Sequence, residues 1–297
     1  MAAGRTLLIG MYDYLLVVGP GRSGSDFLYR ILRAHPDYAF PEIKEGAYYR
    51  SVRAYKRASA KVCPAGKVLC DIANDAYHDP KLTPGVRALQ SQGVSVLMMV
   101  LLRNHRDRAV SAMRFRKSRG RPSALGSARR LEESVVQDRL TPAMLEDIFG
   151  LDVDVLTVDF ATLVEDTESF LAKLASLCGT GPFDSLATDP VNVSTQARFV
   201  WLSTLGWLGA VALRRLGLTR VLQRIKDSCA IGRVFFKPLA PGVREIQLSE
   251  TSAGTLDDAH RECWSVVMRD SAKEHEGLFL RRASTSSPGP GMVDSNQ

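Results

Sequence analysis

A short stretch near the N-terminus, LLVVGPGRSGSDFLYRILRAHP at residues 15–36, limits most strongly what this chain can fold into. Its apolar run, Leu15 to Val18, stops at a glycine-rich turn and is followed by a helical pattern with apolar residues on one face. That order predicts a strand, a tight loop and a helix. The first amides of a helix lack partners within it and the helix dipole is positive at that end, so the loop is expected to hold an anion.

The loop departs from the pattern of proteins that hydrolyse ATP or GTP. Their motif, G-x-x-x-x-G-K-[ST], uses the lysine for the outer phosphates and the hydroxyl for magnesium. Gly19 and Gly24 have the matching spacing, but Ser25 and Asp26 stand where lysine and the hydroxyl residue should be. Hydrolysis of ATP or GTP is therefore poorly supported. The loop alone leaves two interpretations open, an anion-binding site or a turn without a ligand.

Strand and helix patterns alternate along the rest of the N-terminal half. Further strands are predicted in GKVLCDIAND, SVLMMVLL and DVDVLTVDF, with helical patterns over 51–61, 103–120 and 162–179, the last closed by Gly179. The unbroken apolar run at 95–102 is typical of a parallel strand covered on both faces. We therefore expect an α/β fold of three layers, α/β/α, with a central parallel sheet, a P-loop-like anion-binding loop and a helical C-terminal elaboration.

The domain prediction is a single domain over residues 12–282. It divides into a nucleotide-binding α/β core over 12–182 and a mostly helical part over 183–282, followed by a disordered tail over 283–297. Within the segment 199–222, the apolar part from Phe199 to Leu213 is interrupted by polar residues and is too short for a membrane span. Two interpretations of it stay open, a packed helix or helix pair and a surface that receives a lipid or makes peripheral membrane contact.

Composition narrows the partners. The net charge of +7 and a pI near 9.3 suit an anionic ligand, but the basic residues are scattered and not interleaved with aromatic ones, so no nucleic acid partner is expected. The five cysteines are an odd number without metal-ligand spacing, which predicts neither disulfides nor a metal site and favours the cytoplasm. The first 18 residues lack a small-residue cleavage site and are expected to lead into the first strand.

A second motif, VLLRNHRDRAVSAMRF, places Arg103 at the end of a predicted strand and Ser111 eight residues later on the next helix. Together with GPGRSGSDFL, it resembles the sulfotransferases that use 3′-phosphoadenosine 5′-phosphosulfate (PAPS). In that family the arginine and serine bind the 3′-phosphate and the first loop binds the 5′-phosphosulfate. The resemblance thus assigns Arg103 and Ser111 to the 3′-phosphate. It assigns these residues to the phosphosulfate: Arg22, Ser23, Gly24, Ser25, Asp26 and Phe27.

Three other stretches support the resemblance, which covers about residues 14–200. FPEIKEGAYY resembles the Lys-Glu segment of the Golgi-type and bacterial branches, so Glu45 is implied as the catalytic base and Lys44 as the neutralising cation. LTVDFATLVEDTESFLAKLASLCG resembles the family's strand–helix unit, and VNVSTQAR its Asn-x-Ser segment. Asn192 and Ser194 are therefore expected to order a loop near the nucleotide.

Some residues depart from the family pattern or offer alternatives. Asp26 replaces a hydroxyl residue and would repel the donor unless its carboxylate turns away, His105 replaces a proline, and Phe160 replaces a tyrosine. His35 and His78 are alternative bases, although His35, which precedes Pro36, is expected to end a helix. Asp71 either lines the acceptor cleft or caps a strand end.

The resemblance implies a PAPS-dependent sulfotransferase that acts on a hydroxyl, or an amine, of a small-molecule, sugar or lipid acceptor and releases 3′,5′-adenosine diphosphate (PAP). In-line transfer without metal is expected, because a sulfuryl group carries less negative charge than a γ-phosphoryl group. The apolar segment 199–222 favours an acceptor with an apolar portion. Two rival functions stay open, a P-loop small-molecule kinase and a catalytically inactive nucleotide-binding protein.

Overall fold

The structure is a computed structural model in which part of the C-terminal half is left undescribed. It describes residues 11–41, 44–63, 66–118, 127–183, 195–197, 209, 213, 236–238, 246–275 and 277–283. Several sequence expectations lie outside these ranges: Asn192, Ser194, most of the segment 199–222, and the tail from residue 284 onward. The domain boundaries stay a prediction for the same reason.

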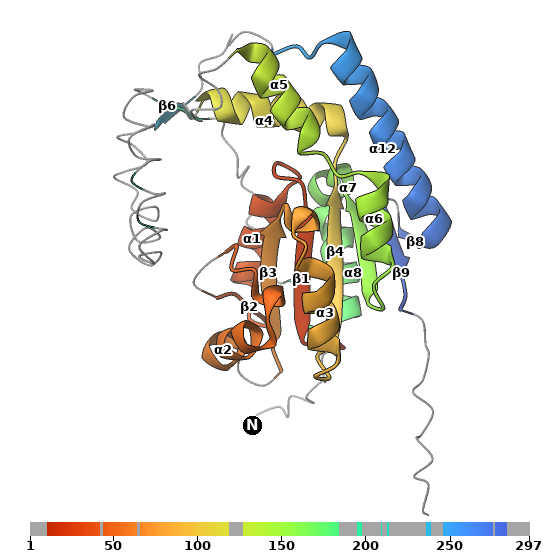
Figure 1. Ribbon diagram of the computed structural model, residues 1–297. Helices are drawn as coiled ribbons and strands as arrows, with labels where there is room; N and C mark the ends of the chain where they lie inside the picture. The colour runs from red at the N-terminus through yellow and green to blue at the C-terminus, as the bar shows by residue number, and fades with distance from the viewer. Residues whose placement is uncertain are drawn as a thin grey trace, which may run out of the picture.

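A seven-stranded sheet forms the centre of the molecule, in the order β2-β3-β1-β4-β5-β9-β8 (Figure 1). The first five strands are parallel, whereas β9 runs antiparallel to β5 and β8 antiparallel to β9. The bounds are β1 Tyr14–Gly19, β2 Tyr38–Ala39, β3 Val68–Asn74, β4 Val96–Leu102, β5 Asp154–Asp159, β8 Ala272–His275 and β9 Leu278–Arg281; β6 Thr195–Ala197 pairs separately with β7 Phe236–Pro238.

Helices cover both faces of the sheet. They are α1 Ser25–Ala34, α2 Val52–Val62, α3 Leu82–Gln90, α4 His105–Ser118, α5 Ala128–Gln137, α6 Pro142–Phe149, α7 Phe160–Glu165, α8 Thr167–Cys178 and α12 Glu250–Asp270, with short 3-10 helices η1 Tyr48–Arg50 and η2 Ala76–His78. In Figure 1, α3 and α6 lie in front of the sheet and α8 behind it, while α4 and α5 lie above the strand ends.

Two large hydrophobic clusters lie one on each face of the sheet, because successive side chains of a strand point to opposite faces, and a smaller third cluster joins α4, α5 and α12. Along β1, Leu16 and Val18 join the cluster with α3 and α6, and Leu15 and Val17 join the one with α1 and α8. Strand β4 is buried at every position. This burial on both faces is what an unbroken apolar strand requires.

The α/β/α fold class is therefore confirmed, and α12 provides a helical C-terminal part. Two expectations needed refinement: the sheet is mixed rather than wholly parallel, and residues 162–179 form two helices that meet at Asp166. Gly179 ends α8 in a left-handed conformation, as predicted. Among the residues that the structure describes, no helix is both long and apolar enough to cross a membrane.

Candidate functional site

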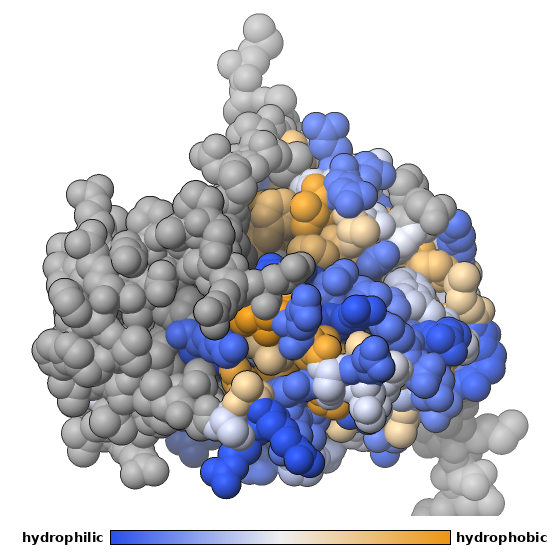
Figure 2. Space-filling view, turned by 90° about the horizontal axis from the view of Figure 1, so that it is seen from above, coloured by the Kyte–Doolittle hydropathy of each residue, from blue (hydrophilic) through white to orange (hydrophobic). Residues whose placement is uncertain are grey.

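The region between the loops that follow β1 and β4, which we call the crevice, lies at a switch point in the order of the sheet. These strands are neighbours, yet the chain leaves β1 toward β2 and β3, on one side, and leaves β4 toward β5, on the other. Loops that diverge from adjacent parallel strands leave room between them, and open α/β sheets bind ligands at this point. The glycine loop after β1 and Arg103 after β4 both lie here. Figure 2 views the molecule from above, with hydrophilic residues around exposed apolar ones.

The glycine loop leads into α1 through Gly24. This residue adopts φ +95°, and a Cβ atom on it would lie 2.7 Å from Cδ2 of Leu163, so the position requires glycine. Gly24 is also the N-cap of α1 and has no side chain to accept hydrogen bonds from the first turn. The first amides of α1 are therefore left for an external acceptor.

Ser23 carries an unusual buried hydroxyl. The residue is 1% exposed, and its Oγ has no hydrogen-bond partner among the described residues. A buried polar atom without a partner is costly and calls for an explanation such as a ligand. Ser25, at the start of α1, is also buried. The loop therefore combines helix amides with an unpaired hydroxyl, which is the donor set that an anion requires.

Arg22 and Arg103 meet in the crevice, together with Ser111. An Nη1 of Arg103 donates to the carbonyl of Arg22 at 2.8 Å, and Nε of Arg22 lies 3.5 Å from Oγ of Ser111. The two guanidinium groups each stack on an aromatic ring, Arg22 on Phe115 at 4.8 Å and Arg103 on Phe160 at 4.2 Å. The structure thus joins the two sequence motifs through direct contacts.

The electrostatics of these arginines also favour an anion. Burial lowers the pKa of both side chains. Neither forms an ion pair with a carboxylate of the described residues. The nearby carboxylates of Asp26 and Asp107 oppose this lowering only from a distance, so a directly bound anion would stabilise both cations.

Lys44 and Glu45 lie at the rim of the same crevice. Lys44 forms an ion pair with Asp26, whose side chain is half exposed, and its Nζ lies 5.6 Å from the Tyr29 ring. Glu45 is exposed, and its Oε1 accepts a hydrogen bond of 3.1 Å from Asn74 at the end of β3. Asn74 pairs with Gly19 across the sheet, so Glu45 is held beside the start of the glycine loop.

Asp71 anchors the segment that carries Lys44 and Glu45. It is fully buried in β3 and accepts hydrogen bonds from Tyr14 Oη at 3.0 Å and from the Tyr48 amide at 2.7 Å. Burial raises the pKa of this carboxyl group to about 6, against the hydrogen bonds that lower it. Asp71 therefore neither lines a cleft nor caps a strand end; it ties the backbone after Glu45 to the sheet.

Of the histidines, His35 and His105 have structural roles, whereas the role of His78 as an alternative base stays a prediction. His35 ends α1, as predicted, and its Nε2 lies 3.1 Å from two carbonyl oxygens, those of Gly181 and Pro182. His105 is buried, and its ring nitrogens lie 2.8 Å from the carbonyl of Leu140 and 3.2 Å from that of Arg103. Burial lowers the pKa of His105 to about 4, so the ring is neutral and holds the start of α4 in place. His78 lies exposed in η2.

Several residues of the crevice were not identified from the sequence. Asn74 and Asp75 contact the base segment and the glycine loop, and Phe115 and Phe160 stack on the arginines. The sequence offered two signals for them: Asn74, Asp75 and Phe160 lie at or directly after the end of a strand, and Phe115 lies on the same face of α4 as Ser111. Phe27, which the resemblance assigns to the donor, is partly buried in the first turn of α1 and packs against the core; its role at the donor stays a prediction.

Comparison with known proteins gives matches among solved structures. A sulfotransferase from Alicyclobacillus acidocaldarius is 20% identical, with a TM-score of 0.45, over 59% of this chain and 84% of that one. A mouse sulfotransferase complexed with PAP is 17% identical, with a TM-score of 0.40, over 58% and 60% of the two chains. The sulfotransferase domain from the curacin biosynthetic pathway is 14% identical, with a TM-score of 0.37, over 56% and 74%. No family model and no curated protein matches the chain.

Proposed function

We propose that this chain is a PAPS-dependent sulfotransferase, which moves a sulfuryl group to a hydroxyl or amine of an acceptor. The observation that supports it most is the meeting of Arg22, Arg103 and Ser111 beside the unpaired hydroxyl of Ser23. Two cations and the N-terminus of α1 in one crevice suit a ligand with two separate anionic groups. PAPS is such a ligand, and the sequence motifs around these residues resemble those of proteins that use it.

The donor would be held by the two motifs. The amides of Ser25 and Asp26, the Ser23 hydroxyl and the Arg22 guanidinium are suited to the 5′-phosphosulfate, while Arg103 and Ser111 are suited to the 3′-phosphate. PAPS supplies an activated sulfuryl group on a phosphate leaving group. The residues of the chain are left to position it and to stabilise charge.

Glu45 is proposed as the general base and Lys44 as the stabilising cation. The exposed carboxylate of Glu45, oriented by Asn74, is available to take the proton that an acceptor hydroxyl loses as its oxygen attacks sulfur. Lys44 lies at the helix end where negative charge would develop, and its ion pair with Asp26 keeps it there in the free protein. The carboxylate of Asp26 then serves to hold Lys44, while its amide is left for the donor.

The loop chemistry supports sulfuryl transfer over phosphoryl transfer. Ser25 and Asp26 stand where a kinase or NTPase of this fold has the lysine and the magnesium-binding hydroxyl. A sulfuryl group carries less charge than a γ-phosphoryl group and needs less neutralisation, so we propose metal-independent transfer. The acceptor is proposed to be a small molecule, sugar or lipid, with an apolar portion that the segment 199–222 would favour.

The proposal is tested by incubating the protein with radiolabelled PAPS and a panel of phenols, long-chain alcohols, sugars and amines, with EDTA or with magnesium. We expect labelled product from at least one class, at equal rates in both conditions, and none with labelled ATP and magnesium. Transfer from ATP that requires magnesium would replace the proposal with a kinase. Absence of transfer with intact PAP binding would leave an inactive nucleotide-binding protein.

A further inference from the structure

Strained backbone marks three places around the crevice. Of the described residues other than glycine, those with positive φ are Arg22 at 77°, Ala47 at 50° and Asp75 at 60°. Residues other than glycine rarely adopt this left-handed conformation, and they keep it only where contacts with the surrounding structure stabilise it. Arg22 belongs to the glycine loop, Ala47 comes two residues after Glu45, and Asp75 directly follows β3. All three therefore border the candidate site.

Asp75 joins the end of β3 to the turn that follows β1. Its amide donates to the carbonyl of Gly19 at 3.1 Å, and its Oδ1 accepts from the amide of Gly21, also at 3.1 Å. The hydroxyl of Tyr77 contacts the same oxygen at 3.4 Å and donates to the Asp138 carbonyl at 2.9 Å. Asp75 thus holds the turn on both sides of Pro20.

Gly21 lies inside a turn that the Ser23 amide closes by donating to the Pro20 carbonyl at 3.2 Å, and Asp75 adds the hydrogen bond to the Gly21 amide itself. A Cβ atom built on Gly21 would have nothing within 4 Å, so packing does not fix the position. The next residue is the strained Arg22, whose carbonyl is held by Arg103. The turn is therefore fixed from β3 by Asp75 and from β4 by Arg103. Because the Gly21 amide is already occupied, a 5′ anion must be held by the amides and side chains from Arg22 onward.

We propose that Asp75 is a positioning residue for the 5′ end of the donor, acting through Gly21. The inference rests on the proposed function, since it assigns a role within the same donor site. An exposed carboxylate near an anion site would ordinarily weaken binding through repulsion. Here its value lies in the hydrogen bond that it accepts, so an uncharged acceptor of the same shape should serve equally well.

The experiment is a calorimetric titration of Asp75→Asn and Asp75→Gly with PAP and with 3′-AMP, which lacks the 5′-phosphate. Asparagine keeps the acceptor oxygen and tolerates positive φ, whereas glycine keeps the backbone conformation and removes the acceptor. We expect PAP to bind Asp75→Asn as tightly as the wild type or slightly more tightly. For Asp75→Gly we expect about tenfold weaker PAP binding and unchanged 3′-AMP binding.

The outcomes separate the two proposals. If the wild-type protein does not bind PAP, the proposed function fails at its first step. If the wild type binds PAP and Asp75→Gly binds it equally well, only the positioning role is wrong. Equal weakening of PAP and 3′-AMP binding in Asp75→Gly also contradicts that role, because a general loss of structure would affect both ligands. Thermal unfolding of each variant checks that it is folded.

Discussion

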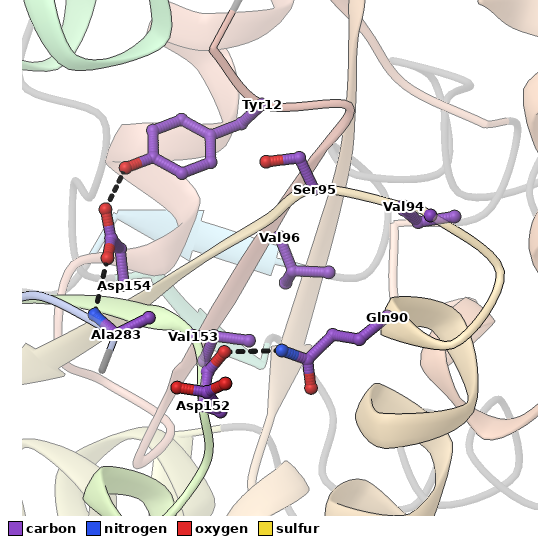
Figure 3. Close-up of a pocket in the computed structure, with 10 residues that line it drawn as sticks. Tyr12, Gln90, Val94, Ser95, Val96, Asp152, Val153, Asp154 and Ala283 are labelled. Atoms are coloured by element: carbon purple, nitrogen blue, oxygen red, sulfur yellow. Dashed lines mark hydrogen bonds between the residues drawn. The ribbon is translucent and has the colours of Figure 1, made fainter. Parts of the chain in front are cut away.

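The two ends of the parallel strands both carry polar clusters, but the clusters differ in what their polar groups bind. At the amino end, a pocket of about 340 Å³ is lined by residues that include Tyr12, Gln90, Asp152 and Asp154 (Figure 3). Asp154 accepts hydrogen bonds from the Tyr12 hydroxyl and from the Ala283 amide at 2.7 Å, and it pairs with Arg282. The amide of Gln90 donates to the Asp152 carbonyl. These polar groups satisfy one another.

The carboxyl end is different. Ser23 has an unpaired buried hydroxyl, and Arg22 and Arg103 have no carboxylate partner among the described residues. No side chain lining the amino-end pocket has a buried polar atom without a partner, within the part of the chain that the structure describes. Strain also gathers at the carboxyl end, at Arg22, Ala47 and Asp75. The amino-end pocket is polar and hollow, but its hydrogen-bonding groups are paired with one another. The carboxyl end has unpaired donors and strained backbone, and these two features favour it as the binding site.

The strongest test of this difference is Glu45→Gln. The amide keeps the shape of the side chain but cannot take a proton, so turnover should fall by about 10²- to 10⁴-fold. The affinity for PAP should not change, because Glu45 contacts no atom of the glycine loop among the described contacts. Single-turnover assays with radiolabelled PAPS and PAP calorimetry measure the two effects. Turnover at the wild-type rate would remove Glu45 from the chemistry.

Asp71 provides a test in pH dependence. Its folded pKa of about 6 lies above the ordinary value of 3.8, so between these pH values the folded protein keeps a proton that the unfolded chain has released. Stability from this group is therefore present at low pH and lost as pH rises through 6. Relative to Asp71→Asn, the wild-type free energy of unfolding should fall by about 2 kcal/mol between pH 4 and 7.

The comparison with Asp71→Asn is needed because His105 acts in the opposite direction. Its folded pKa of about 4 lies below the ordinary 6.5, so its stabilisation is lost as pH falls. That contribution is common to both proteins and cancels in the difference. Chemical unfolding at several pH values gives the measurement. A difference that stays constant with pH would show that Asp71 does not titrate in this range.

Asp154→Ala tests the amino end. The substitution removes the acceptor shared by Tyr12, Arg282 and the Ala283 amide, and should lower the free energy of unfolding by about 2 kcal/mol.

Burial alone would raise the pKa of Asp154, but these hydrogen bonds outweigh it and the pKa is lowered. Its stabilisation is therefore lost as pH falls, opposite in sign to Asp71. PAP affinity should be unchanged; a clear loss would mean that the two ends are coupled.

Asp26→Asn is expected to have the smallest effect. The substitution removes a negative charge beside the proposed anion site and releases Lys44 from its ion pair, so PAP should bind about threefold more tightly at low salt. The gain should shrink at high salt, because both groups are partly exposed and screened. Calorimetry at two ionic strengths checks it. Weaker PAP binding in the variant would indicate that Asp26 positions Lys44 in the bound state.

Much of the fold could be predicted from the sequence, and the reasons are local. Strands such as 95–102 have unbroken apolar runs, and Gly24 and Gly179 mark the ends of helices. The β8–β9 hairpin was missed because its sequence, AKEHEGLFLR, shows little alternation of apolar and polar residues. In addition, β9 pairs with β5, which lies more than a hundred residues earlier in the chain. The break between α7 and α8 was missed because the helical periodicity continues through Asp166.

The site was predictable where motifs carry it and unpredictable where the sheet assembles it. Arg103 and Ser111 were assigned from the resemblance of their motif to a known family, and the structure adds that Arg22 contacts both of them. Asn74 and Asp75 could not be assigned, since their partners lie 29 and 54 residues away and meet them only through the order of β1 and β3.

The most direct test of the account is a calorimetric titration with PAP and with 5′-AMP, using the wild type, Arg103→Ala and Arg106→Ala. Arg106 is a matched control, because it lies only three residues away, in the first turn of α4, and pairs with Asp257 at the surface. We predict that the wild type and Arg106→Ala prefer PAP over 5′-AMP by more than about tenfold, and that Arg103→Ala loses this preference. Equal binding of PAP and 5′-AMP by the wild type would contradict the 3′-phosphate site, and with it the proposed sulfotransferase function.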